Sequence, residues 1–251
     1  MIKYIDTKIL ILCGGKGKRL GKYTKKIPKP LIKVGKIPII QHKISYYKKQ
    51  GFQNITFCVG YKSNIIKNFL NKNYKKTNFS DAGVKCGILK RIYLALKNYK
   101  KTSVISYGDT LAKIDLNDLL KKHKKSKSLM TLVIAPIKNP FGIVKWNSKN
   151  KLTSFDEKPT LNHFIGYAVI ESKIFNYLSK NIINSKDGIG MVKAIKKLIL
   201  KRQVNVYKYN GLQLTINSIS ELKDARRKIG KYITFNSKSF FTKWDPIKPA
   251  P

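Results

Sequence analysis

The sequence predicts an α/β fold with a mostly parallel central sheet flanked by helices, and three observations support this prediction. An apolar run at residues 8–13 has the length of a buried strand and ends in glycine. Residues 38–50 repeat apolar side chains at helical spacing, and a second strand-like run follows at 54–59. A further helical pattern begins at Ser63, which we expect to cap that helix. Strand, helix, strand and helix in this order are typical of a parallel sheet with right-handed crossovers.

The rest of the chain continues this alternation after a polar stretch at residues 71–87, which we expect to be irregular. The other expected elements, in order, are a helix at 88–98, a strand at 103–107, a helix at 116–123 capped by Asp115 or Asn117, a strand at 129–135, a hairpin of 141–146 and 152–155 with its turn at 147–150, a strand at 163–170, helices at 172–180 and 189–200, strands at 203–208 and 212–216, and a helix at 221–233 capped by Ser220. We find no internal repeat and no linker, so we expect one domain over residues 1–235 and a loosely ordered tail at 236–251.

Length and composition indicate a globular cytoplasmic protein. The chain has 251 residues, of which 42% are hydrophobic, enough for one large buried core. No apolar run is long enough to predict a membrane span, and the first run is too short for a signal peptide. The three cysteines, Cys13, Cys58 and Cys86, lack the spacing of metal ligands, which favours reduced thiols.

The charge balance is strongly basic, with 53 Lys and Arg against 12 Asp and Glu. Nucleic-acid binding is one interpretation of this excess. Arginine, however, occurs only at positions 19, 91, 202, 226 and 227, and lysine is spread along the whole chain rather than clustered with aromatic residues. We therefore favour a solvated lysine-rich surface with no nucleic-acid partner, whose field attracts small anionic substrates.

A glycine-rich loop after the first strand is the main candidate for a binding site. Gly14, Gly15 and Gly17 allow backbone N–H groups to approach a ligand closely, because no Cβ intervenes. Arg19 follows within the loop, and Lys29 stands between two prolines shortly after it. Backbone N–H groups beside cations favour phosphate oxygens, so the loop predicts a nucleoside triphosphate site.

Two further patterns suggest the remainder of a site. The strand at 103–107 runs directly into Gly108 and Asp109, and ligands of open α/β sheets bind beyond the carboxyl ends of strands. Asp109 is therefore a candidate metal ligand, the alternative being an aspartate that caps a helix or closes a turn. Further on, Glu157 and Lys158 precede a proline, which predicts an extended segment with the two side chains on opposite sides.

These pieces together resemble the sugar-1-phosphate nucleotidyltransferases, over about residues 8–235. The motifs, in chain order, are Gly14-Gly15-x-Gly17-x-Arg19-Leu20, Pro28-Lys29-Pro30, Cys58-Val59-Gly60-Tyr61-Lys62, Tyr107-Gly108-Asp109, Phe141-Gly142 and Glu157-Lys158-Pro159. Within that family the chain looks most like the glucose-1-phosphate cytidylyltransferases, through residues 58–62, Asp81-Ala82-Gly83 before Leu89-Lys90-Arg91, and residues 107–109.

The resemblance implies a Rossmann-like (GT-A-like) fold with a small β-rich acceptor-binding part, and transfer of a nucleoside monophosphate. CTP is the favoured donor, a sugar-1-phosphate or similar phosphorylated small molecule the acceptor, pyrophosphate the leaving group and Mg²⁺ the cofactor. Nucleotide-sugar and polysaccharide biosynthesis in the cytoplasm is the implied setting, and a homo-oligomer is compatible with it. The implied residues are Arg19, Lys29 and Asp109 for catalysis; Cys13, Gly14, Gly15, Gly17, Lys18, Arg19, Lys29, Gly87 and Gly108 for the nucleotide; Glu157, Lys158 and Gly166 for the acceptor; and Asp109 and Asn217 for the metal.

The chain departs from the family pattern at three places. Asn217 stands where the family has its second metal aspartate, and an amide oxygen ligates Mg²⁺ without adding charge. Cys86 replaces the first glycine of a Gly-Gly pair, and Phe164-Ile165-Gly166 replaces Asn-Gly-Gly. The acceptor then differs from an ordinary hexose phosphate, or activity is weak or lost. The alternative function is a non-catalytic nucleotide-binding relative with a regulatory or partner-binding role.

Overall fold

A twisted seven-stranded sheet forms the centre of the molecule in the computed structural model, which describes residue 4 and residues 6–234. The tail predicted at 236–251 lies outside the described residues. From one edge to the other, the strands are β12 (Val204–Lys208), β8 (Met130–Lys138), β11 (Thr160–Ile170), β6 (Ser103–Tyr107), β1 (Lys8–Leu12), β4 (Ile55–Val59) and β5 (Asn78–Asp81). Only β11 runs against its neighbours β6 and β8, so the predicted mostly parallel sheet is confirmed.

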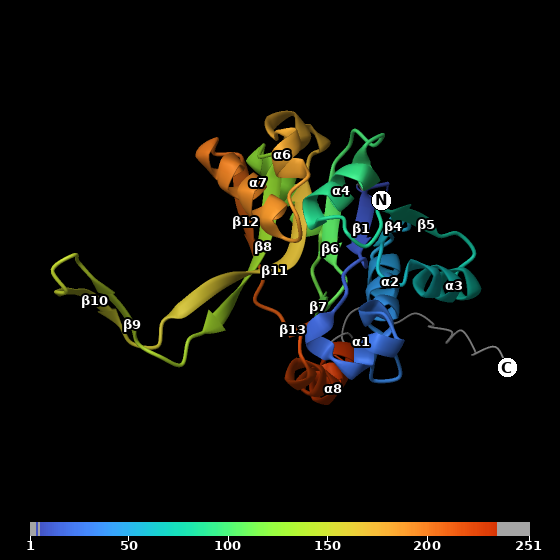
Figure 1. The fold of residues 1–251 in the computed structure, drawn as a ribbon, viewed down its shortest axis with the longest axis horizontal. Helices are drawn as coiled ribbons and strands as arrows, with labels where there is room; N and C mark the ends of the chain where they lie inside the picture. Colours follow the sequence, from blue (N-terminus) through green and yellow to red (C-terminus); the bar gives the residue numbers. More distant parts are fainter. Residues whose placement is uncertain (1–3, 5, 235–251) are drawn as a thin grey trace.

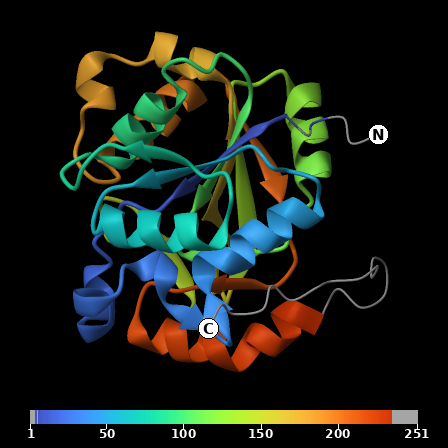
Figure 2. The ribbon, with the colours of Figure 1, turned by 90° about the vertical axis from the view of Figure 1, so that its right-hand side faces the viewer.

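Helices cover both faces of this sheet because its central strands are apolar on both sides. On β1, Ile9 and Ile11 point to one face and Leu10 to the other, as the two-residue period of a strand requires. The helices on the first face are α2 (Ile39–Lys49), α3 (Ser63–Asn73) and α5 (Leu116–Ser126), and those on the second are α4 (Ile88–Leu96) and α7 (Ile189–Leu200). Figure 2 shows α2 and α3 on the side of the sheet opposite to α4 and α7.

A third apolar cluster closes the edge of the sheet where the parallel strands end. It is built around α8 (Ile219–Thr234), whose Leu222, Ala225 and Ile229 pack against two small antiparallel pairs. These pairs are β2 (Lys33–Val34) with β3 (Ile37–Pro38), and β7 (Thr110–Ala112) with β13 (Gln213–Thr215). Three short helical segments, η1 (Lys18–Leu20), α1 (Lys22–Lys26) and η2 (Lys29–Leu31), lie in the loop after β1.

The predicted hairpin projects from the body of the molecule. It pairs β9 (Ile143–Trp146) with β10 (Leu152–Asp156), and the Asn147 side chain accepts hydrogen bonds from the backbone N–H groups of Lys149 and Lys151 in the turn. Most of its large apolar side chains are exposed, Phe141 and Trp146 among them. The hairpin is the small β-rich part that the sequence predicted.

Several local predictions are wrong. Residues 172–180 do not form one helix: η3 (Ser172–Tyr177) ends before Ser179, which caps the separate α6 (Lys180–Ile183). Residues 71–87 are not wholly irregular, because their backbone supplies the edge strand β5, whose half-exposed side chains have no apolar alternation.

Two predicted helix caps are also wrong, whereas Asp115 does cap α5. Ser63 makes no side-chain cap bond, since α3 follows Lys62, which has a left-handed backbone. Ser218, not Ser220, caps α8: its hydroxyl accepts from the Glu221 N–H while the Glu221 carboxylate accepts from the Ser218 N–H. Within the described residues, we find no helix with the length and apolar content that crossing a membrane requires.

Candidate functional site

A pocket of about 250 Å³ lies at the carboxyl ends of β1 and β6, where the sequence predicted a ligand site. Its lining residues are Leu12, Cys13, Gly15, Gly17, Lys18, Arg19, Lys29, Pro30, Gly108, Asp109 and Asn217. The structure thus gathers most of the nucleotide, catalytic and metal candidates into one pocket, although they come from three distant parts of the sequence.

Gly108 joins the end of β6 to the loop after β1. Its N–H donates to the Leu12 carbonyl at 3.0 Å, and a Cβ on Gly108 would lie only 2.5 Å from that oxygen. A side chain at this position would push the two strand ends apart. The glycine therefore keeps Asp109 close to the glycine-rich loop.

The pairing of β7 with β13 brings Asn217 to Asp109. The Ile216 N–H donates to the Asp109 carbonyl at 2.9 Å, and Thr215 lies opposite Thr110 in the pair. Beyond β13, the Glu221 carboxylate accepts hydrogen bonds from the N–H groups of Asn217 and Ser218, which fixes the turn into α8. The prediction that residues 109 and 217 share a site is consistent with this arrangement.

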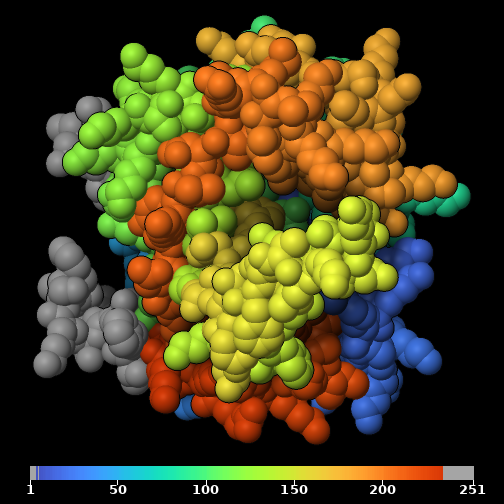
Figure 3. All heavy atoms as spheres, turned by 90° about the vertical axis from the view of Figure 1, so that its left-hand side faces the viewer, coloured from blue at the N-terminus to red at the C-terminus, as the bar shows by residue number. Residues whose placement is uncertain are grey.

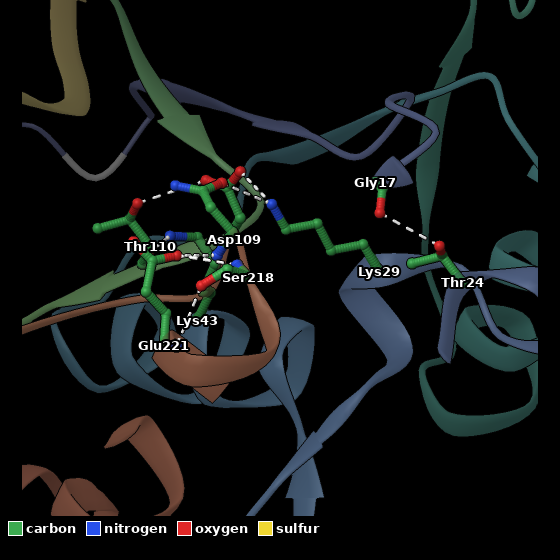
Figure 4. A network of polar contacts seen from close by, with 9 residues as sticks. Gly17, Thr24, Lys29, Lys43, Asp109, Thr110, Ser218 and Glu221 are labelled. Carbon is green, nitrogen blue, oxygen red and sulfur yellow. Dashed lines mark hydrogen bonds and ion pairs between the residues drawn. The ribbon is translucent and has the colours of Figure 1, made fainter. Parts of the chain in front are cut away.

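Lys29 completes the cluster from the other side of the pocket (Figure 4). Its Nζ donates to Oδ2 of Asp109 at 2.7 Å and to Oδ1 of Asn217 at 2.8 Å. The Lys29 side chain is 12% exposed and that of Asp109 26%, so the ion pair is partly shielded from water. The ammonium group therefore lies between the two oxygen atoms that the sequence proposed as metal ligands.

Lys43 supports the cluster from the protein interior, and sequence reasoning missed it. Lys43 is 1% exposed, and its ammonium group donates at 2.6 Å both to the Thr110 carbonyl and to the Tyr167 hydroxyl. Burial lowers the pKa of Lys43 to about 7, and the negative charge of Asp109 opposes this change. The sequence did contain a signal that Lys43 is buried, because this residue lies four positions from Ile39 and from Tyr47, on the apolar face of α2.

Glycine plays a different structural role at each of the three positions in the loop. Gly17 has a φ of +63°, which favours glycine, and its carbonyl accepts a hydrogen bond from the Thr24 hydroxyl at 3.2 Å. A Cβ on Gly15 would meet no atom within 4 Å, so this position faces open space in the pocket. Gly14 instead lies against Arg91: a Cβ there would approach Nη1 of the guanidinium to 2.5 Å.

Arg91 is a second buried cation that sequence reasoning did not assign to the site. It is 4% exposed, and its guanidinium donates to the carbonyls of Val59, Gly83 and Cys86. It thereby connects the end of β4 and the segment before α4 to the loop after β1. Burial raises the pKa of the Cys13 thiol on that loop, which keeps this pocket residue neutral.

Gly87 and Gly166 lie outside the pocket lining. A Cβ on Gly87 would collide with the Ser185 carbonyl oxygen, so this glycine packs against the segment before α7. Gly166 has a φ of +80° at the irregularity in the β11–β8 pairing, and a Cβ there would lie 2.9 Å from Cβ of Tyr107. The side chain of Tyr107 therefore packs closely against Gly166.

Glu157 and Lys158 lie in a bend after β10, and the predicted extended geometry is wrong. Lys158 has a φ of +47°, a left-handed conformation that the following proline did not prevent. The two side chains therefore meet, with Nζ 3.3 Å from Oε1, rather than pointing to opposite sides. Both side chains are more than half exposed, and the two residues directly follow β10 of the hairpin. Figure 3 shows the molecule from the face from which the hairpin projects. In that view the face is hollowed above the hairpin, below α7.

Comparison with known proteins gives consistent matches. The family model described as nucleotidyl transferase matches residues 8–228. The chain is 29% identical to the probable glucose-1-phosphate cytidylyltransferase of Bacillus subtilis, over 88% of this chain and 95% of that protein. It is 31% identical to the D-glycero-alpha-D-manno-heptose 1-phosphate guanylyltransferase of Campylobacter jejuni, over 70% of this chain and 77% of that protein. The bifunctional protein GlmU of Methanocaldococcus jannaschii is 30% identical, and the match covers 49% of its length.

Solved structures share the fold. A Bacillus anthracis protein in complex with a sucrose superposes with a TM-score of 0.71 at 20% identity, over 94% of this chain and 98% of that one. HddC from Yersinia pseudotuberculosis, complexed with GMP-PN, gives 0.67 at 19% identity, over 89% of this chain and 99% of that one. The family match over most of the chain, with the pocket geometry, shows that the protein belongs to the nucleotidyl transferase family.

Proposed function

We propose that the pocket transfers a nucleoside monophosphate from a nucleoside triphosphate to a sugar-1-phosphate or a similar phosphorylated small molecule. The observation that carries this proposal is the convergence of Lys29, Asp109 and Asn217 beside the glycine-rich loop. In the reaction, an acceptor phosphate oxygen forms a bond to the α-phosphorus. The bond from that phosphorus to the oxygen bridging to the β-phosphate breaks, and pyrophosphate leaves.

Positioning and charge neutralisation account for catalysis of such a step, which needs no covalent enzyme intermediate. The loop at Gly15 and Gly17, with Cys13, Lys18 and Gly108 around it, binds the nucleotide through backbone groups. Arg19 holds the pyrophosphate as it leaves. Lys29 neutralises the α-phosphate as negative charge builds on it. Gly14 acts indirectly through Arg91, while Gly87 shapes the backbone before α4.

The oxygen atoms of Asp109 and Asn217 suit Mg²⁺, which prefers hard oxygen ligands and is commonly held by one or two carboxylates together with substrate phosphates. When bound, the metal ion would neutralise charge on the triphosphate. Asp109 contributes the negative charge of this ligand pair and Asn217 a neutral carbonyl oxygen, so the chain offers a weaker metal site than two carboxylates would.

CTP is the favoured donor, supported by the similarity to a cytidylyltransferase over nearly the whole chain. The match to a guanylyltransferase makes GTP the first competitor to test. On the acceptor side, Glu157 contacts hydroxyl groups of the acceptor and Lys158 pairs with the acceptor phosphate. Gly166 shapes the wall of the acceptor site beside Tyr107. Residues 1–235 function as one cytoplasmic domain, with the exposed hairpin available for contacts in a homo-oligomer.

The deciding experiment measures pyrophosphate release from CTP, GTP, UTP, dTTP and ATP, each with a panel of sugar-1-phosphates and other phosphorylated acceptors, in the presence of Mg²⁺. Release with one donor and one acceptor, lost on Asp109→Ala, supports the proposal. Calorimetric nucleotide binding without turnover across the panel would instead favour the non-catalytic alternative.

A further inference from the structure

The position of the Lys29 ammonium group has a consequence for metal binding that goes beyond the proposed function and rests on it. Nζ lies within 2.8 Å of both Asp109 Oδ2 and Asn217 Oδ1, so one cation already occupies the space between the two ligand oxygens. Any other cation that binds there must displace the ammonium group of Lys29, whose side chain is only 12% exposed and is paired with the carboxylate. The two candidate metal ligands, Asp109 and Asn217, therefore already have a hydrogen-bond donor within the protein.

Within the part of the chain that the structure describes, the surroundings of the ligand pair offer no uncommitted acidic group to compensate. Asn217 contributes a neutral oxygen, and the nearby Glu221 is committed to the helix cap through the N–H groups of Asn217 and Ser218. Among the residues that the structure describes, no group of three or more His, Cys, Asp or Glu side chains could hold a metal ion. Lys29 and Asp109 cancel one another, so the ligand pair presents no net negative charge to an approaching divalent cation.

Binding of a nucleoside triphosphate changes the charge balance around Lys29 and Asp109. Its oxygens are stronger partners for Lys29 than a single carboxylate is, because they carry more negative charge, and Lys18 and Arg19 line the same pocket. When Lys29 turns to the phosphates, Asp109 and Asn217 become free to contact a cation that the phosphates carry. We propose that Lys29 and Asn217 keep Asp109 closed to free divalent cations, and that the protein accepts its metal only as the complex with the nucleoside triphosphate.

The test follows Mn²⁺ binding by the EPR signal of the free ion, so it does not depend on activity. Without nucleotide, the wild-type chain should show no saturable Mn²⁺ site below about 1 mM, since a lone paired carboxylate is a weak ligand set. With a CTP analogue whose α–β bridge resists cleavage, one Mn²⁺ per chain should bind.

Two substitutions should open the site without nucleotide. Asn217→Asp adds a carboxylate and Lys29→Met removes the competing ammonium, and each should raise the affinity for free Mn²⁺ at least about tenfold. Asn181→Asp, an exposed position on α6 that does not line the pocket, adds the same charge elsewhere and should behave as the wild type.

Saturable binding of free Mn²⁺ to the wild type that Asp109→Ala abolishes would overturn the inference and leave the proposed function intact. Equal Mn²⁺ affinities for Asn217→Asp and Asn181→Asp would also overturn it. If calorimetry shows that none of the nucleoside triphosphates binds, with or without Mn²⁺, the proposed function itself fails.

Discussion

Substituting Gly14 by alanine tests whether this glycine serves Arg91 or the ligand. A methyl group on Gly14 would lie 2.5 Å from Nη1 and 2.9 Å from Nε of Arg91, well inside normal contact distances. The guanidinium cannot move away freely, because it is 4% exposed and donates to the carbonyls of Gly83 at 2.8 Å and Cys86 at 3.1 Å as well as to Val59.

The expected cost follows from these contacts. Overpacking a buried site costs about 1–3 kcal/mol, and loosening one hydrogen bond from a charged donor costs about 1.5–3 kcal/mol. We therefore expect Gly14→Ala to lower the free energy of unfolding by about 2–3 kcal/mol, measured as a shift in the urea midpoint at unchanged slope. Gly15→Ala is the matched control: its methyl group would meet nothing within 4 Å, so stability should change by less than about 0.5 kcal/mol.

The same pair of variants separates structure from binding. Gly15 faces the pocket, so Gly15→Ala should raise the KM for the nucleotide while leaving the urea midpoint in place. A double-mutant cycle completes the test: in an Arg91→Leu background, Gly14→Ala should cost close to nothing, giving a coupling energy of about 2–3 kcal/mol. Equal urea midpoints for Gly14→Ala and Gly15→Ala, or an unchanged cost of Gly14→Ala without Arg91, would refute this reasoning.

Three further predictions concern charged groups. Asp109→Ala should reduce turnover in the pyrophosphate-release assay by at least about 100-fold, because Asp109 is the carboxylate of the ligand pair, and near-normal turnover would contradict that role. Lys43→Met should leave the protein at least as stable at pH 7, since burial of the ammonium charge is costly. The folded-state pKa of Lys43, about 7, lies below its ordinary value of 10.5, so between these pH values the unfolded chain binds more protons than the folded chain. The stability of the wild type relative to Lys43→Met should therefore rise with pH across that window by on the order of 4 kcal/mol. Parallel urea-denaturation profiles of the two proteins against pH would contradict this. The His123 hydrogen bond lowers the pKa of Glu171 from its ordinary 4.5, so this carboxylate stabilises the fold above that pH and loses its contribution as pH falls through the lowered value. Glu171→Gln should therefore cost about 1–2 kcal/mol at pH 7 in urea denaturation and much less near pH 3, and a cost independent of pH would show that charge is not the cause.

The sequence predicts most of the sheet and most of the pocket because both leave local signals. Apolar runs ended by glycine mark β1, β4 and β6, and the residues that follow β1 and β6 meet at one edge by the geometry of parallel strands. The edge strand β5 gives no such signal, because its side chains are only half buried and its pairing is made by backbone groups.

The buried cations show where sequence reasoning fails. In a chain with 53 Lys and Arg, the default expectation places each one in solvent, and this default hides Lys43 and Arg91. Helical spacing put Lys43 on the apolar face of α2, but periodicity cannot show which carbonyl groups a buried ammonium will find. Arg91 is similar, since its partners are backbone oxygens of β4 and of the segment just before α4, which leave no trace in residue type.

Local rules also failed where two of them compete. The proline after Lys158 favours an extended backbone, yet the bend after β10 turns Lys158 to a positive φ and pairs it with Glu157. At α8, two serines compete for the cap, and Glu221 three residues after Ser218 decides between them, a pattern that was readable in the sequence.

The pairing of β7 with β13 sets the order in which this protein becomes functional during synthesis. Lys29 meets a partner 80 residues away in Asp109 and another 188 residues away in Asn217. Closing so long a loop costs chain entropy before its contacts can stabilise the fold, so the contacts around Asn217 form late. A nascent chain can build β1, β4 and β6 from its first half, yet it stays without a complete pocket until β13 and the start of α8 have left the ribosome.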